Sequence, residues 1–154
     1  LREISDRQCF AAYDSNKEKQ YGDVKMEKIK VIAKEVGKPA RPYEIENSYK
    51  AIKNFVGGNI ETHDYPSFDE VTIYCNRDLQ QTDVTIVLEE HQACLCGNCL
   101  IVKQDMESDG ESVSFSDEEV RIMLDDVSKR EICRKGLTRE DVMQCFGNFT
   151  EMEM

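Results

Sequence analysis

The sequence lacks any apolar run long enough to span a membrane. A membrane helix needs about 20 consecutive apolar residues, and no stretch of these 154 residues approaches that length. The first 23 residues also lack the apolar core of a signal peptide, because charged residues occur throughout them. Hydrophobic residues make up 40% of the chain and charged residues 33%, as in soluble globular proteins. We therefore expect a cytoplasmic protein that does not bind membranes.

The chain is also short of positive charge. It holds 20 lysines and arginines against 31 aspartates and glutamates, a formal net charge of −11. A nucleic-acid-binding protein needs a basic face for the phosphate backbone, so direct binding of nucleic acid is not expected. The acidic excess has two interpretations. It is either an ordinary solvated surface or a surface that docks onto a basic groove of a protein partner, where electrostatic attraction would speed association.

Histidine is scarce, with only His63 and His91 present. A nucleophile and its base would have to use one of them, and neither lies beside a serine or cysteine in the context of a nucleophile elbow. His63 and Asp64 are interpreted as part of a turn. Gly57-Gly58 follows a predicted helix instead of preceding one, and no Gly-Lys-Ser/Thr phosphate loop occurs. We assign no catalytic residues. The sequence favours a protein that is not an enzyme and leaves open the alternative of an enzyme whose catalytic groups converge from distant positions.

Seven cysteines are present, an odd number in a chain without an export signal, so reduced thiols are expected. The sharpest local pattern is His91, Cys94, Cys96 and Cys99, because thiolates and imidazoles are the preferred ligands of tetrahedral zinc. The spacing is unusual for zinc, however. In a strand, Cys94 and Cys96 point to one face and Cys99 to the other. Zinc as a cofactor, buried core cysteines and a redox pair remain three alternatives for this run.

Apolar periodicity and turn residues predict six strands and three helices. Asn47 or Ser48 can cap the start of one helix, and Gly57-Gly58 can end it. Ser116 and Glu119 form a capping box that marks the start of the next helix. The strands are expected at residues 28–32, 41–45, 59–62, 70–75, 84–88 and 98–103, and the helices at residues 47–56, 116–127 and from about 138.

The resulting order, β-β-α-β-β-β-β-α-α, does not alternate strands and helices regularly. It predicts an α+β fold with a mostly antiparallel sheet and helices packed on one face. Residues 1–23 are interpreted as a polar N-terminal leader. Residues 24–154 are expected to form a single α+β domain with a C-terminal helical extension from about residue 137, a size sufficient for a hydrophobic core.

Several short motifs occur in order between about residues 28 and 127. They are Ile29-Lys30-Val31-Ile32, Gly37-Lys38-Pro39, Ile45-Glu46-Asn47, Val56-Gly57-Gly58-Asn59-Ile60-Glu61, Ile73-Tyr74-Cys75-Asn76, Gly97-Asn98-Cys99-Leu100-Ile101-Val102 and Ser116-Asp117-Glu118-Glu119. In these motifs the chain resembles a bacterial and phage family catalogued as domain of unknown function 3846. The resemblance implies a small α+β domain found in phages, plasmids and conjugative elements of gut Firmicutes. It brings no reaction and no catalytic residues with it.

Three functional hypotheses follow from these observations. The first is an acidic, non-enzymatic interaction protein of a phage or mobile element. In one version it is an anti-defence (anti-CRISPR-like) inhibitor that occupies a basic surface on a host protein. The second is a module that binds a small, nucleotide-like ligand. The third is a zinc-stabilised domain that uses His91, Cys94, Cys96 and Cys99.

Overall fold

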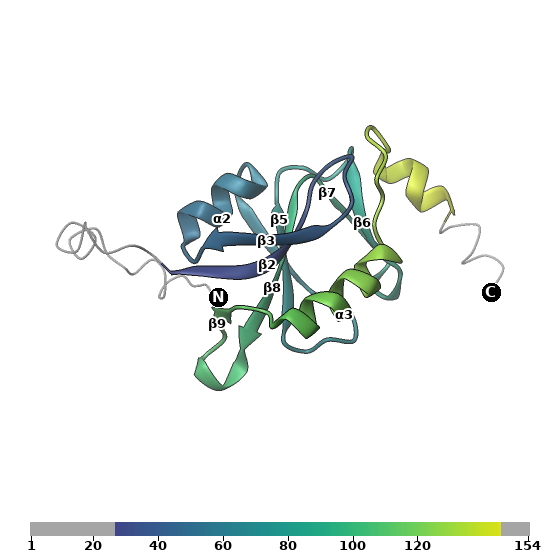
Figure 1. Cartoon of the computed structure of the whole chain (residues 1–154). Helices are drawn as coiled ribbons and strands as arrows, with labels where there is room; N and C mark the ends of the chain where they lie inside the picture. Colours follow the sequence, from purple (N-terminus) through teal and green to yellow (C-terminus); the bar gives the residue numbers. More distant parts are fainter. Residues whose placement is uncertain (1–26, 146–154) are drawn as a thin grey trace.

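A computed structural model describes residues 27–145 of the chain (Figure 1). Its strands are β2 (Lys28–Lys34), β3 (Arg41–Glu46), β4 (Ile60–Asp64), β5 (Val71–Asn76), β6 (Val84–Leu88), β7 (Ala93–Cys96), β8 (Cys99–Asp105) and β9 (Glu111–Val113). Its helices are α2 (Tyr49–Val56) and α3 (Asp117–Ser128), with short 3-10 turns η1 (Glu89–His91) and η2 (Met106–Ser108). Residues 139–145 are also helical. The predicted leader, residues 1–23, lies outside the described residues.

The main sheet is antiparallel, with the strand order β3-β2-β8-β5-β4. β8 lies in its middle, where Ile101 faces Ile32 of β2 on one side and Ile73 of β5 on the other. β9 joins the sheet by pairing with the C-terminal part of β8. The predicted α+β class and element order are confirmed. The short strands β7 and β9 are additional to the predicted elements.

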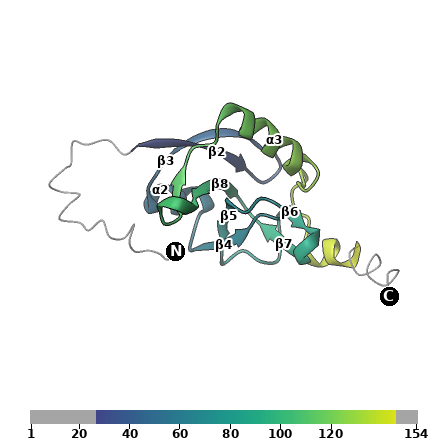
Figure 2. The same cartoon turned by 90° about the horizontal axis from the view of Figure 1, so that it is seen from below.

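Different elements cover the two faces of this sheet. Along β8, Leu100 and Val102 pack in the same cluster as Ile52 of α2, whereas Ile101 packs in the same cluster as Met123 of α3. Figure 2 shows α3 running along one side of β2 and α2 lying on the other side. The expectation that the helices share one face is corrected. The central strand is apolar on both of its sides, and each side needs its own cover.

The hairpin of β6 and β7 forms a second, two-stranded sheet. Residues 130–139 run beside the outer edge of β6. The Ile132 N–H donates to the Thr85 carbonyl oxygen at 2.8 Å, and the Val84 N–H donates to the Leu137 carbonyl oxygen at 3.0 Å. These bonds satisfy backbone groups that an edge strand would otherwise leave open. They also attach the segment after α3 to the domain.

Within residues 27–145, no helix combines the length and apolar character that crossing a membrane requires.

The ends of α2 follow the predicted signals. Ser48 caps its start, and Gly57 ends it with a left-handed backbone, φ = 87°. The side chain of Asn76, at the end of β5, donates to the Val56 carbonyl oxygen at 3.2 Å and so satisfies one of the last carbonyls of the helix. A side chain at Gly58 would place its Cβ 2.8 Å from the Asn76 Nδ2. This part of the family motifs therefore holds α2 against β5.

Candidate functional site

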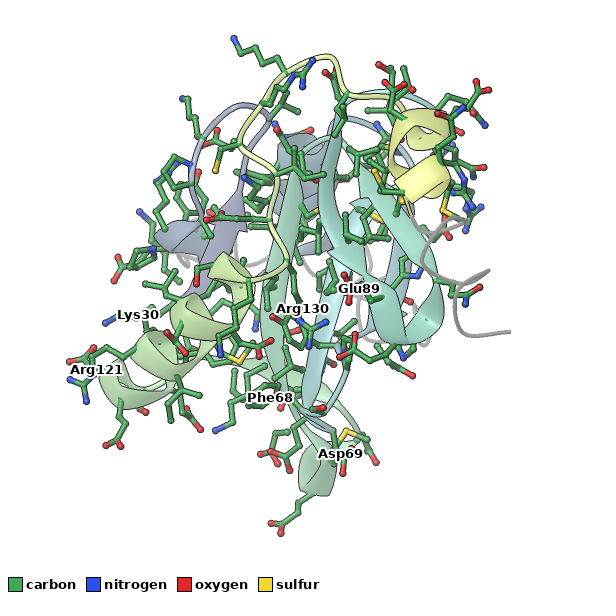
Figure 3. All side chains as sticks on the ribbon, turned by 90° about the vertical axis from the view of Figure 1, so that its right-hand side faces the viewer. Lys30, Phe68, Asp69, Glu89, Arg121 and Arg130 are labelled. Carbon is green, nitrogen blue, oxygen red and sulfur yellow. The ribbon has the colours of Figure 1, made fainter. Side chains whose placement is uncertain are left out.

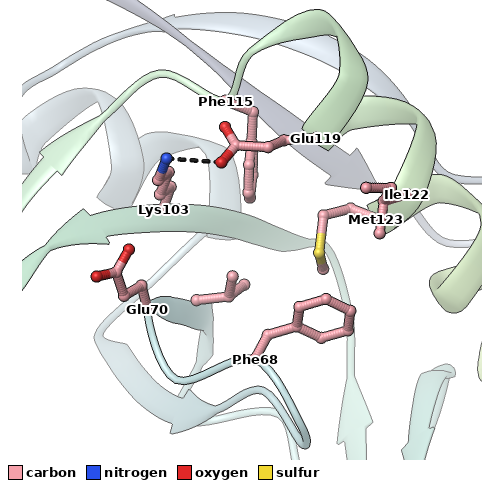
Figure 4. Close-up of a pocket in the computed structure, with 8 residues that line it drawn as sticks. Phe68, Glu70, Lys103, Phe115, Glu119, Ile122 and Met123 are labelled. Atoms are coloured by element: carbon pink, nitrogen blue, oxygen red, sulfur yellow. Dashed lines mark hydrogen bonds and ion pairs between the residues drawn. The ribbon is translucent and has the colours of Figure 1, made fainter.

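A hollow of about 310 Å³ lies between the loop before β5, strand β8 and helix α3 (Figure 4). We call it the α3 pocket. Five apolar and three charged residues line it, namely Phe68, Val71, Phe115, Ile122 and Met123, with Glu70, Lys103 and Glu119. Ligand pockets typically measure about 300–1,000 Å³. The α3 pocket is therefore large enough for one bulky side chain or one small molecule.

The inner wall of the α3 pocket is apolar. Val71, Phe115 and Met123 are all buried, whereas Ile122 at the opening is 48% exposed. Successive residues of a helix point about 100° apart, so Met123 reaches the core while Ile122 turns outward. Phe115 is held in place because its backbone N–H donates to the Lys30 carbonyl oxygen at 3.1 Å. The pocket thus continues the hydrophobic core to the surface.

The opening of the pocket is charged. Lys103 Nζ lies 2.7 Å from Glu119 Oε2, and the other carboxylate oxygen of Glu119 accepts the Ser116 N–H at 2.8 Å in the capping box of α3. The hydrogen bond from Lys103 lowers the pKa of Glu119, and the same bond raises the pKa of Lys103. Both groups are therefore charged at neutral pH. Glu70 adds a second carboxylate at the opening.

Tyr65 fixes the loop that carries Phe68. The Tyr65 hydroxyl donates to Asp126 Oδ2 of α3 at 2.7 Å, and the ring of Phe68 meets the Tyr65 ring edge-on with centroids 5.7 Å apart. Burial and the hydrogen bond to Asp126 raise the pKa of Tyr65, so its hydroxyl stays protonated and able to donate. Ser67 adopts φ = 71°, which turns the chain tightly before Phe68. The wall of the pocket is therefore positioned by contacts with α3.

Arg130 joins this loop to α3 and η1. Its Nη1 and Nη2 donate to the two carboxylate oxygens of Glu90 at 2.6 and 3.0 Å, and its Nε donates to Asp126 at 2.8 Å. Its guanidinium also lies 5.2 Å from the centroid of the Tyr65 ring. The bond from Arg130 lowers the pKa of Glu90 to about 2. Figure 3 shows Phe68, Arg130 and Glu89 on one side of the molecule, where Arg130 also lines a second hollow of about 500 Å³.

Negative charge is concentrated in the part of the chain that builds the α3 pocket. Residues 60–126 hold 17 acidic and three basic residues, whereas residues 27–59 hold four acidic and seven basic residues. One of those three bases, Lys103, is paired with Glu119. Asp69, Glu118 and Arg121 lie next in sequence to pocket residues and are exposed, so two of these three neighbours are acidic. The surroundings of the pocket therefore attract cations and repel anions.

The four residues predicted as zinc ligands do not form one cluster. His91 is exposed in η1, Cys94 and Cys96 are buried in β7 against Val142, and Cys99 is buried in the cluster on the α3 side of β8. In the described part of the chain, no three His, Cys, Asp or Glu side chains gather as a metal site requires. Burial raises the pKa of Cys96 to about 11. Zinc binding stays a prediction, which metal analysis of the purified protein and its stability in chelator would test.

His63 belongs to strand β4 and not to the turn in which it was expected. Its Nε2 lies 3.1 Å from Glu61 Oε2, and hydrogen bonding to Cys75 raises the pKa of the imidazole. The pKa of the Cys75 thiol is itself raised, by its hydrogen bond to Cys99 and by burial. A protonated, buried thiol is a poor nucleophile. We therefore do not assign His63 and Cys75 as a catalytic pair.

Sequence reasoning missed the α3 pocket altogether. Its residues come from the loop at 68–71, from Lys103 in β8, from Phe115 and from α3, and they meet only after folding. Phe68 is an aromatic residue directly after a turn, outside the alternation of a strand, and this was the one local signal available. Glu119 was identified, but only as a helix cap.

The family described as Domain of unknown function (DUF3846) matches residues 29–128. The match covers more than half of the 154 residues, so the chain belongs to this family, and the resemblance found in its motifs is confirmed. No curated protein and no solved structure matches the chain.

Proposed function

We propose that this member of the family is a non-enzymatic docking module that binds a basic surface of a protein partner. In this proposal the partner inserts an apolar side chain into the α3 pocket and places lysines or arginines against the carboxylates around it. The single observation that carries the proposal is the arrangement of the pocket. A buried apolar wall opens at the surface between Glu70 and the ion pair of Lys103 and Glu119.

Protein interfaces concentrate their binding energy in a few anchors that fill apolar pockets, surrounded by polar contacts that exclude water. The α3 pocket can hold such an anchor, because Phe68, Phe115 and Met123 would contact an inserted side chain on several sides. The exposed side chain of Ile122 extends the apolar surface outward. An aliphatic or aromatic anchor of the partner would replace water at this wall.

The distribution of charge favours a partner whose binding surface is positively charged. With 17 acidic and three basic residues in the segment 60–126, long-range attraction would accelerate encounter with a basic surface. It would also disfavour a ligand that carries phosphate groups. A docking module of this kind is consistent with an anti-defence protein of a phage or mobile element. Such a protein would compete with nucleic acid for a basic groove on a host enzyme.

A small-molecule function is the second candidate, and the volume of the pocket favours it. About 310 Å³ with two phenylalanine rings in the wall suits one aromatic ring. Because carboxylates surround the opening, such a ligand would be neutral or cationic. A thermal-shift comparison of nucleobases with nucleoside triphosphates separates the ideas, since only the uncharged rings should stabilise the protein.

The docking proposal can be tested with a random library of 12-residue peptides selected on the immobilised protein. We expect enriched peptides to carry one large apolar residue flanked by lysines or arginines. Their affinity should fall as salt is raised, because salt screens the charges around the opening. Phe68→Ala should weaken binding by about tenfold or more, as removal of an anchor contact does. The double variant Glu70→Gln/Glu119→Gln should weaken it by about two- to fivefold.

Matched controls keep this test specific. Glutamine at position 119 still accepts the Ser116 N–H, so the α3 cap is retained. Glu44→Gln/Glu46→Gln removes the same charge from the edge strand β3, away from the pocket, and should change affinity little. Enriched peptides without basic residues, or equal losses in both double variants, would refute the proposal.

A further inference from the structure

Lys34 is the last residue of β2, and its side chain has no exposed surface. Its ammonium group contacts three groups from two segments. These are the Lys38 carbonyl oxygen, Glu131 Oε1 at 3.4 Å and Cys133 Sγ at 3.6 Å. The contacts with Lys38 and Cys133 are hydrogen bonds donated by the ammonium group, and the contact with Glu131 is an ion pair. The lysine nitrogen is therefore held in a fixed place beside a sulfur atom.

Cys133 is accessible from solvent, unlike the cysteines of the sheets. It is exposed, whereas Cys75, Cys94, Cys96 and Cys99 are all buried. Burial covers the thiols of Cys94 and Cys96 and raises their pKa, so they stay protonated. Cys133 is thus an exposed residue whose sulfur contacts the covered nitrogen of Lys34.

We infer that Cys133 and Lys34 form an oxidative modification site whose substrate is a hydroperoxide. Oxidised Cys133 is captured by the Lys34 nitrogen as a sulfenamide, a covalent sulfur–nitrogen bond. Sulfenic acids condense with a backbone nitrogen to give this bond, and in the inferred site the lysine amine takes the place of that nitrogen. The site consists of an exposed cysteine residue in contact with a wholly buried amine. It is independent of the proposed docking function.

The chemistry balances with hydrogen peroxide as the oxidant. Cys133, having lost its proton to water, attacks one peroxide oxygen. The O–O bond breaks, and the sulfur keeps that oxygen as a sulfenic acid. The departing hydroxide takes a proton from the Lys34 ammonium, which yields water and a neutral amine. The amine nitrogen then attacks the sulfur, the S–O bond breaks, and hydroxide leaves with a hydrogen from nitrogen as a second water. The two electrons that the sulfur loses reduce the peroxide.

The bond joins two segments that already meet. Lys34 and Cys133 are 99 residues apart in sequence, and the Ala40 N–H also donates to Glu131 Oε1 at 2.8 Å. A covalent link across so long a loop restricts the unfolded chain far more than the folded one. Oxidation should therefore raise the midpoint of thermal unfolding and keep the segment after α3 attached to β2.

The experiment treats the full chain with a slight excess of hydrogen peroxide and follows its intact mass. We expect a product lighter by two hydrogen atoms that has lost one thiol and one amine and is restored by dithiothreitol. Peptide mass spectrometry should place the link between Lys34 and Cys133. A product of the same mass that has lost two thiols is a disulfide, and it would overturn the inference.

Three variants complete the test. Cys133→Ser should abolish the link, while Cys145→Ser, which changes the other exposed described cysteine, should leave it intact. Lys34→Met removes the nitrogen from a buried position, so sulfenic acid should accumulate and be labelled by dimedone several-fold more than in the unaltered chain. If Lys34→Met fails to fold, dimedone labelling of the unaltered chain still tests whether Lys34 captures the sulfenic acid. Strong, persistent labelling of Cys133 there would refute capture by Lys34.

Discussion

The two faces of the main sheet are packed in different ways. On the α2 face, helix and sheet meet directly, and Gly58 allows a side-chain amide of the sheet to reach the end of the helix. On the α3 face, Val120, Met123 and Val127 of the helix pack into the buried cluster of the sheet. An ion pair and the arginine network add polar contacts there, and the α3 pocket opens beside them at the surface. The α2 face therefore serves stability alone, whereas the α3 face combines a packed core with surface available for binding.

The largest expected effect separates these roles within one pair of variants. Leu100→Ala removes a fully buried side chain from the α2 face, and we expect the free energy of unfolding to fall by about 2–5 kcal/mol. Phe68→Ala, at a partly exposed position of the pocket, should cost about half as much. Denaturant unfolding measures both changes in stability. The affinity of each variant for the selected peptides is measured under conditions in which the variant is folded. If Leu100→Ala weakened peptide binding as strongly as Phe68→Ala, the division between the faces would fail.

A smaller effect is expected at the close contact behind α2. In Gly58→Ala, the new Cβ would lie 2.8 Å from Asn76 Nδ2 and displace the amide from the Val56 carbonyl oxygen. Loss of that buried hydrogen bond should cost about 1–3 kcal/mol. The check is a double-mutant cycle. The alanine should cost clearly less in an Asn76→Ala background, because the displaced group is already absent. Additive costs would show that the crowding does not involve Asn76.

The smallest effect concerns the polar network of the α3 face and depends on pH. The pKa of Glu90 is about 2 in the folded chain against an ordinary 4.5. Its ion pair therefore stabilises the fold fully above about pH 4.5, and this contribution is lost as the pH falls toward 2. The Glu90 side chain is 48% exposed, so solvent screening limits the contribution to about 0.2–1 kcal/mol.

Glu90→Gln should therefore destabilise the protein at pH 7 and have little effect near pH 2. Glu89→Gln provides the matched control, since it removes the neighbouring exposed carboxylate without an ion pair to Arg130. Denaturant unfolding across this pH range measures both variants. A loss of stability for Glu90→Gln that stays constant from pH 7 to pH 2 would contradict the role given to the ion pair.

Elements with strong local signals could be predicted. The glycine pair after α2, the capping box before α3 and the apolar run of β8 each act over a few residues, so the sequence indicates them directly. The strands β7 and β9 were missed because they are short, and β9 contains little apolar sequence. β7 and β9 form only because they pair with β6 and β8, and such pairing is not visible in a short stretch of sequence.

The candidate site could not be predicted in the same way. The run from His91 to Cys99 is close in sequence, but a tight turn at Gly97 places its cysteines on two strands that belong to different clusters. Conversely, Phe68 and Met123 are distant in sequence and line one pocket. Neighbours along a chain share a site only when the backbone directs their side chains to the same side.

The sequence by itself determined the α+β class, the family, the helix ends and the surplus of negative charge, because each depends on composition or on contacts within a few residues. Only the tertiary structure decided that the helices divide between two faces and that an apolar wall reaches the surface beside Lys103 and Glu119. It alone also brought Lys34 against Cys133. Those features require segments up to 99 residues apart to meet, and pairings at that range are set by how the whole core packs.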